Sequence, residues 1–220
     1  MIRPAFSASL LVAALSIVVL PGCPTTPAAT TYAPLQQAFD KADALAIADA
    51  LEALIGDGKD TERDRQLAYD HIKLKEEPTA AYAYARAMVT GRLVQAKGLT
   101  AALLVREMEE WAHKSRSLDP TFRSGAAARM IGTLYVLAPA SLLRGGDSEK
   151  GLEILEKLVQ EYPDALENHL RYAEALIALG DPGPATAPLC RCIAQKSRLQ
   201  KGDQHLLEKL IQDAGSPTCP

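Results

Sequence analysis

Residues 130–155 read MIGTLYVLAPASLLRGGDSEKGLEIL. Both ends of this stretch repeat apolar residues at helical spacing, but its middle contains a proline, a serine and a double glycine, which disfavour an uninterrupted helix. Asp147 follows the two glycines and is a residue type that caps helix N-termini. We therefore predict two helices joined by an insertion that is longer than a tight turn requires.

Helix-breaking residues also separate helical segments elsewhere along the chain. Prolines follow helical segments at Pro78, Pro120 and Pro163, and helix pairs separated in this way are typical of repeat arrays. The interval from Pro120 to Pro163 exceeds the roughly 34 residues of a tetratricopeptide repeat, and the surplus lies in the insertion. The last repeat fits the tetratricopeptide register best, with suitable residue types at His169, Tyr172, Ala173, Leu176, Gly180 and Ala185.

The composition also favours helices. Hydrophobic residues make up 48% of the 220 residues but aromatic residues only 5%, and alanine and leucine are good helix formers. The formal net charge of -3 gives no electrostatic basis for nucleic-acid binding. We predict an all-α fold: a tetratricopeptide-like helical-hairpin repeat array with inter-helix insertions and a C-terminal capping helix.

Helix limits follow from the same patterns. One helical stretch runs from Leu35 to Ile55, and the next starts at Thr61, which has the spacing of a capping box with Asp64. Near the C-terminus, residues 203–213 carry four apolar side chains on one stripe. A helix with such a stripe is suited to cover the open end of the array.

The N-terminus has the pattern of a signal peptide. Arg3 is the only charge before an apolar run that ends at Leu20, and this run is too short for a comfortable membrane span. The Leu-Pro-Gly-Cys that follows resembles the lipobox of bacterial lipoproteins, in which the cysteine is acylated; an ordinary secretory signal is the alternative. We predict a lipoprotein signal peptide over 1–22, a lipidated Cys23 with a flexible tether over 23–34, and a helical-repeat domain over 35–220.

Three segments of the repeats resemble one protein family. They are GTLYVLAP at 132–139, GGDSEKGLEILEKL at 145–158 and ENHLRYAEAL at 167–176. These segments are similar to the T-component lipoproteins associated with TRAP transporters, the TatT-like proteins, which share the Gly-x-Leu-Tyr helix, the Ala-Pro break and the Gly-Gly-Asp cap. The resemblance extends over residues 78–196.

The resemblance implies a periplasm-facing lipoprotein, anchored to the membrane by its lipid, that acts as an adaptor for a protein partner. The implied partner is a TRAP-type solute-binding protein, and a homo-oligomer is an open alternative to a monomer. The resemblance implies no enzyme activity and no cofactor. Pro24 resembles the outer-membrane sorting pattern of lipoproteins, so the periplasmic face of the outer membrane is the expected location in a Gram-negative cell. A general scaffold for envelope or secretion-system assembly is the second functional hypothesis.

No residue pattern points to catalysis or to a metal. Neither a GxSxG motif nor a phosphate-binding glycine loop occurs. The four histidines lie on different repeats, without cysteine or carboxylate companions at metal-ligand spacing; they are His71, His113, His169 and His205.

Binding residues are expected on the concave face of the array, which the first helix of each pair lines. Arg129 and Glu174 are the strongest candidates for polar recognition, and pairing with each other or exposure to solvent is the alternative. The repeat register projects five residues onto the concave face: Tyr82, Arg129, Thr133, Glu167 and Glu174.

Three cysteines remain after Cys23, which is an odd number for an oxidising compartment. In the repeat register Cys192 points into the helix pair, whereas Cys190 lies off that face. We predict a disulfide between Cys190 and Cys219 that holds the C-terminal tail, with Cys192 in the core. A metal site at the Cys-x-Cys is the alternative, but two thiolates do not complete a tetrahedral shell.

Overall fold

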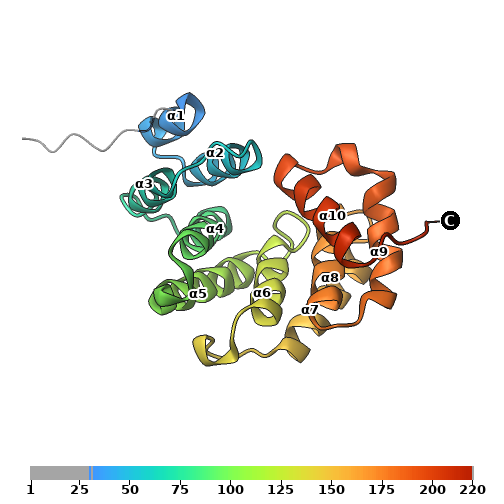
Figure 1. Cartoon of the computed structure of the whole chain (residues 1–220). Helices are drawn as coiled ribbons and strands as arrows, with labels where there is room; N and C mark the ends of the chain where they lie inside the picture. Colours follow the sequence, from blue (N-terminus) through green and yellow to red (C-terminus); the bar gives the residue numbers. More distant parts are fainter. Residues whose placement is uncertain (1–29, 31, 220) are drawn as a thin grey trace, which may run out of the picture.

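A computed structural model describes residue 30 and residues 32–219 of the chain. The predicted signal peptide and the predicted lipidation site at Cys23 lie outside the described residues. The described part is an all-helical repeat array (Figure 1). Its α-helices are α1 (Ala33–Lys41), α2 (Ala44–Gly56), α3 (Glu62–Ile72), α4 (Ala80–Lys97), α5 (Ala102–Leu118), α6 (Ala126–Leu137), α7 (Ser148–Glu161), α8 (Leu166–Ala178), α9 (Pro182–Ala194) and α10 (Lys201–Asp213).

Three consecutive hairpins, α4/α5, α6/α7 and α8/α9, form the middle of the array. The predicted insertion lies between α6 and α7 and contains a short 3-10 turn at Ala140–Leu142. It is held by Glu109, a buried carboxylate that accepts hydrogen bonds from Arg144 N at 2.9 Å and from Tyr135 Oη at 3.1 Å. Asp147 then caps α7 by accepting a bond from Lys150 N at 2.9 Å, so the insertion is an ordered loop.

The N-terminal region differs from prediction in two ways. The stretch expected to be one helix is two helices, because Ala42 adopts a left-handed conformation (φ 49°) and Asp43 caps α2 through a bond from Ala46 N at 3.0 Å. The predicted tether boundary at residue 34 is also wrong, since α1 begins at Ala33 with Pro34 in its first turn. Proline fixes a helical φ and lacks only an N–H that the first turn leaves unpaired.

Other N-terminal details agree with the sequence. Thr61 and Asp64 form the predicted capping box at the start of α3. Thr30 precedes α1, and its hydroxyl donates to Asp64 Oδ1 at 2.7 Å. This bond attaches the segment before α1 to the N-terminus of α3. Among the described residues, no helix combines the length and the apolar character that crossing a bilayer requires.

The last helix, α10, covers the end of the array as predicted, with Leu207 and Leu210 packed into the apolar cluster between α8 and α9. It also packs against α2, which the sequence did not indicate. At this contact a Cβ on Gly56 would lie 3.0 Å from Gly202 N, and Lys201 Nζ lies 2.5 Å from Asp57 Oδ1. The two ends of the repeat array therefore meet (Figure 1), and the concave face surrounds a central space.

Candidate functional site: a central cavity

A half-open cavity of about 770 Å³ lies on the concave side of the array. Its wall is formed mainly by α4 and α6, and is completed by α2, α5, α8, the start of α10 and the loops on either side of α6. Small-molecule sites in proteins are typically about 300–1,000 Å³. The cavity is therefore of the size that takes a small molecule and is too small for a folded partner.

Helix α6 supplies two polar side chains to the cavity, Arg129 and Thr133. They lie four residues apart and so share one face of the helix. The hydroxyl of Thr133 is buried and has no hydrogen-bond partner among the described residues. The oxygen has almost no accessible surface, so it is not an exposed polar group of the cavity wall.

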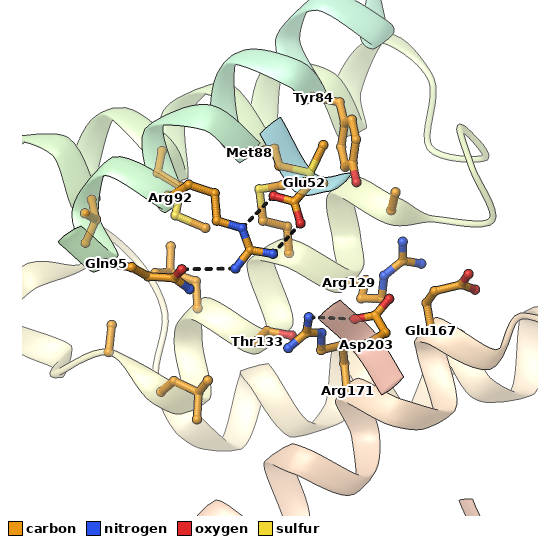
Figure 2. Close-up of a pocket in the computed structure, with 18 of the residues that line it drawn as sticks. Glu52, Tyr84, Met88, Arg92, Gln95, Arg129, Thr133, Glu167, Arg171 and Asp203 are labelled. Atoms are coloured by element: carbon orange, nitrogen blue, oxygen red, sulfur yellow. Dashed lines mark hydrogen bonds and ion pairs between the residues drawn. The ribbon is translucent and has the colours of Figure 1, made fainter. Parts of the chain in front are cut away.

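Three arginines in the wall are neutralised by carboxylates, and Figure 2 shows two of the pairs, those of Arg92 and Arg171. Each pair joins elements that are distant in sequence, so the pairs also hold the wall together. The pairs are Arg92 with Glu52 at 2.5 Å, Arg123 with Asp49 at 2.6 Å, and Arg171 with Asp203 at 3.1 Å.

The arginine–carboxylate pairs shift the pKa of two of their members. The hydrogen bonds that Arg123 donates to Asp49 raise the pKa of Arg123 above its ordinary value. Burial opposes the charged form of Arg171, but Glu174 and Asp203 outweigh burial and raise its pKa. Arg123 and Arg171 therefore remain charged, and their charges are compensated within the protein.

Arg129 differs from the other arginines in the wall. Its Nη1 donates to Asn168 Oδ1 at 2.7 Å, and the amide of Asn168 in turn donates to Ser124 O at 3.1 Å. Within the described part of the chain, Arg129 forms no ion pair, and burial lowers its pKa. Glu167 faces it from the start of α8 (Figure 2), close enough to act on it electrostatically but outside ion-pair distance.

The rest of the wall is largely apolar. Methionines are prominent there, and their flexible side chains adapt to ligands of different shape. The cavity is thus amphipathic, with charged groups from α2, α4, α6, α8, α10 and the loop before α6, and an apolar region mainly from α4, α5 and α6. The apolar side chains are Met88, Val94, Val105, Met108, Met130, Leu134, Leu137 and Leu142.

The structure places three of the five residues predicted for the concave face in the cavity wall: Arg129, Thr133 and Glu167. Tyr82 is a wrong prediction, because it is only 2% exposed and belongs to the N-terminal core. Its ring meets Trp111 edge-on with centroids 5.5 Å apart, and its hydroxyl donates to Ile72 O at 3.1 Å. The extra packing of α3 against α4 buries a position that an isolated hairpin would leave open.

Glu174 is also absent from the wall. It accepts a hydrogen bond from Arg171 Nη1 at 2.8 Å, one turn back on the same helix, and so orients an arginine that does line the cavity. The alternative that Arg129 and Glu174 pair with each other is wrong as well, because each has another partner, Asn168 and Arg171 respectively.

Sequence reasoning missed the wall residues outside the first helices of the hairpins. Asp49 and Glu52 come from α2 and Asp203 comes from α10, and no local pattern shows that these helices meet. Arg123 comes from a loop in which it and the next two residues all have positive φ. The sequence of the loop alone does not indicate this backbone conformation.

The cysteines are arranged as the repeat register indicates. Cys190 and Cys219 form a disulfide with an S–S distance of 2.01 Å, which leaves Cys190 no thiolate for the alternative Cys-x-Cys metal site. Cys192 is a buried thiol in the C-terminal cluster, and burial raises its pKa to about 12. In the described residues, no group of three or more His, Cys, Asp or Glu side chains is placed to hold a metal ion.

Comparison with known proteins finds no protein-family model that matches the chain and no curated protein with significant similarity to it.

Proposed function

We propose that the protein is a lipid-anchored adaptor of the bacterial cell envelope that holds a small solute in its central cavity and works beside a TRAP-type solute-binding protein. The observation that carries this proposal is the closure of the repeat array by α10 on α2 around a cavity of small-molecule size. An open array would offer its concave face to a protein partner. With α10 packed on α2, that face forms a half-open cavity of solute size, and the protein partner docks on the outside of the array.

Two features of the sequence support the location and the partner. The Leu-Pro-Gly-Cys ending at Cys23 favours a lipid anchor on the periplasmic side of a membrane. The resemblance to TRAP-associated T-component lipoproteins is strongest over residues 122–178, which include α6, α7 and α8. Two of these helices, α6 and α8, are in contact and supply Arg129 and Glu167 to the same part of the cavity wall.

The test is crosslinking in intact envelopes of the source bacterium, followed by capture of tagged full-length protein and identification of the captured proteins by mass spectrometry. A TRAP-type solute-binding protein should be enriched over an unrelated tagged lipoprotein. The Cys23→Ala variant serves as the matched control, because it removes the proposed lipid site and should shift the protein from the membrane to the periplasmic fraction. Capture of secretion or envelope-assembly factors without any solute-binding protein would overturn the proposal in favour of a general scaffold.

A further inference from the structure

Two charged side chains in the described part of the cavity wall, one positive and one negative, form no ion pair. Within residues 32–219, the wall contains four arginines and four carboxylates. Three of each are joined in the pairs described above, and Arg171 also pairs with Glu174, outside the wall, at 2.8 Å. The remaining two are Arg129 and Glu167, which face each other without an ion pair between them (Figure 2).

Arg129 is held in place by a group that leaves its charge uncompensated. Asn168 accepts one of the five guanidinium N–H donors at 2.7 Å, and its own amide is fixed by Ser124 O. A neutral amide orients the guanidinium but does not neutralise it. Burial without a paired carboxylate lowers the pKa of Arg129, so a ligand anion bound here would supply the missing compensation.

Glu167 restricts the kind of anion that this position accepts. A simple carboxylate on Arg129 would come close to the negative charge of Glu167 and be repelled. A ligand that carries an ammonium group next to its carboxylate satisfies both residues at once. A free α-amino acid has this arrangement, with both charged groups attached to one carbon atom.

The apolar region of the wall indicates that the rest of the ligand, beyond its two charged groups, is apolar. Met130 and Leu134 on α6 are neighbours of Arg129 and Thr133, and Met88 and Met108 continue the apolar surface from α4 and α5. Building on the solute-binding role proposed above, we propose that the cavity binds a free α-amino acid with a large apolar side chain, its carboxylate on Arg129 and its ammonium on Glu167.

The first experiment uses wild-type protein and chemical analogues, so it does not depend on whether a variant folds. Isothermal titration calorimetry at pH 7 should detect binding of at least one of L-leucine, L-methionine and L-phenylalanine. For leucine, N-acetyl-L-leucine and 4-methylpentanoate lack the ammonium, and L-leucinamide lacks the carboxylate. Each analogue should bind about tenfold or more weakly than leucine, because each loses one charge-assisted contact.

The second experiment assigns the two charges to the two residues. Arg129→Gln should weaken leucine binding about tenfold or more. Glu167→Gln should weaken leucine binding but strengthen binding of 4-methylpentanoate relative to wild type, since it removes the repulsion. Glu153→Gln, at an exposed site on α7, is the matched control and should leave both affinities unchanged.

The inference is overturned if none of the three amino acids binds wild-type protein, or if the analogues bind as well as leucine. It is also overturned if both cavity variants fold, by their circular-dichroism melting curves, and bind leucine like wild type. Failure here is distinguishable from failure of the proposed function. Enrichment of a solute-binding protein in the envelope experiment together with absent amino-acid binding removes only the ligand class, whereas amino-acid binding without that enrichment removes only the TRAP partner.

Discussion

Gly151 and Gly132 set how closely α6 and α7 approach each other. A Cβ on Gly151 would lie 2.7 Å from the carbonyl oxygen of Gly132 and 2.9 Å from Cβ of Tyr135. Both neighbours belong to rigid parts of the structure, so a larger residue could be accommodated only by moving one helix. The position of α6, and with it the position of Arg129 in the cavity, depends on this contact.

Gly151→Ala should therefore destabilise the protein. Alanine gains up to about 1 kcal/mol of helix propensity over glycine, but overpacking of a close contact typically costs about 1–3 kcal/mol. We expect a net decrease in the free energy of unfolding, measured by urea denaturation. Gly145→Ala is the matched control, because no atom lies within 4 Å of its added Cβ, and it should be neutral or slightly stabilising. Equal stability of the two variants would contradict the role of close helix approach.

At the scale of elements, the C-terminal tail and α9 are joined covalently. The Cys190–Cys219 disulfide spans a sequence separation of 29 and ties the tail that follows α10 back to α9. Cys192 lies two residues from Cys190 but on the buried side of the helix, where its Sγ contacts Leu166 O at 3.5 Å. The two neighbouring cysteines thus have different chemistry because they lie on different faces of one helix.

Thiol counting tests this arrangement in the Cys23→Ala protein. A thiol reagent at pH 8 should label no cysteine in the native protein, because burial raises the pKa of Cys192 to about 12 and thiolates are the reactive form. Unfolding without reductant should expose one thiol, and unfolding with reductant should expose three. Three thiols without reductant would contradict the disulfide.

The same shift predicts a pH dependence of stability. The pKa of Cys192 is raised in the folded protein from its ordinary value of 9.0. Between these two pKa values the unfolded chain binds fewer protons than the folded protein. The contribution of Cys192 to the free energy of unfolding is therefore fully present below pH 9, and it is lost as the pH rises from about 9 toward about 12.

At the scale of the whole molecule, closure of the array is the feature that creates the cavity. The contact between α2 and α10 combines the close approach of Gly56 to Gly202 with the ion pair between Lys201 and Asp57. This ion pair is exposed and such pairs contribute little, so we attribute the closure to close packing of the two helices. The pairs that join α2 to Arg92 of α4 and to Arg123 of the 119–125 loop hold α2 in the position that α10 meets.

Gly56→Leu should separate the two ends of the array, since its side chain would displace the backbone of Gly202. Nitroxide labels at Glu62→Cys and His205→Cys, both exposed sites, would report the separation by pulsed electron resonance in the Cys23→Ala background. We expect a longer and broader distance distribution than in the unsubstituted array. Gly183→Leu, at an exposed helical glycine of α9, is the control and should leave the distribution unchanged. If Gly56→Leu also leaves it unchanged, the helix contact does not close the array.

Helix content, hairpin pairing, the capping residues Thr61 and Asp147, and the inward and outward faces of α9 followed from the sequence alone. These features depend on interactions within a few residues or within one helix pair, where apolar periodicity and capping types carry the information. The same register was sufficient to bring Arg129, Thr133 and Glu167 to one concave face.

Only the tertiary structure decided that this face encloses a cavity. The meeting of α2 and α10 depends on the summed small rotations between successive helix pairs, and a small change in each would leave the ends apart. Tyr82 is buried by the packing of α3 and does not reach the cavity. Contacts between helices far apart in the chain bring Asp49, Glu52 and Asp203 into the cavity wall. The sequence determined which side chains each helix presents, and the accumulated geometry of the whole array determined which of them face one another.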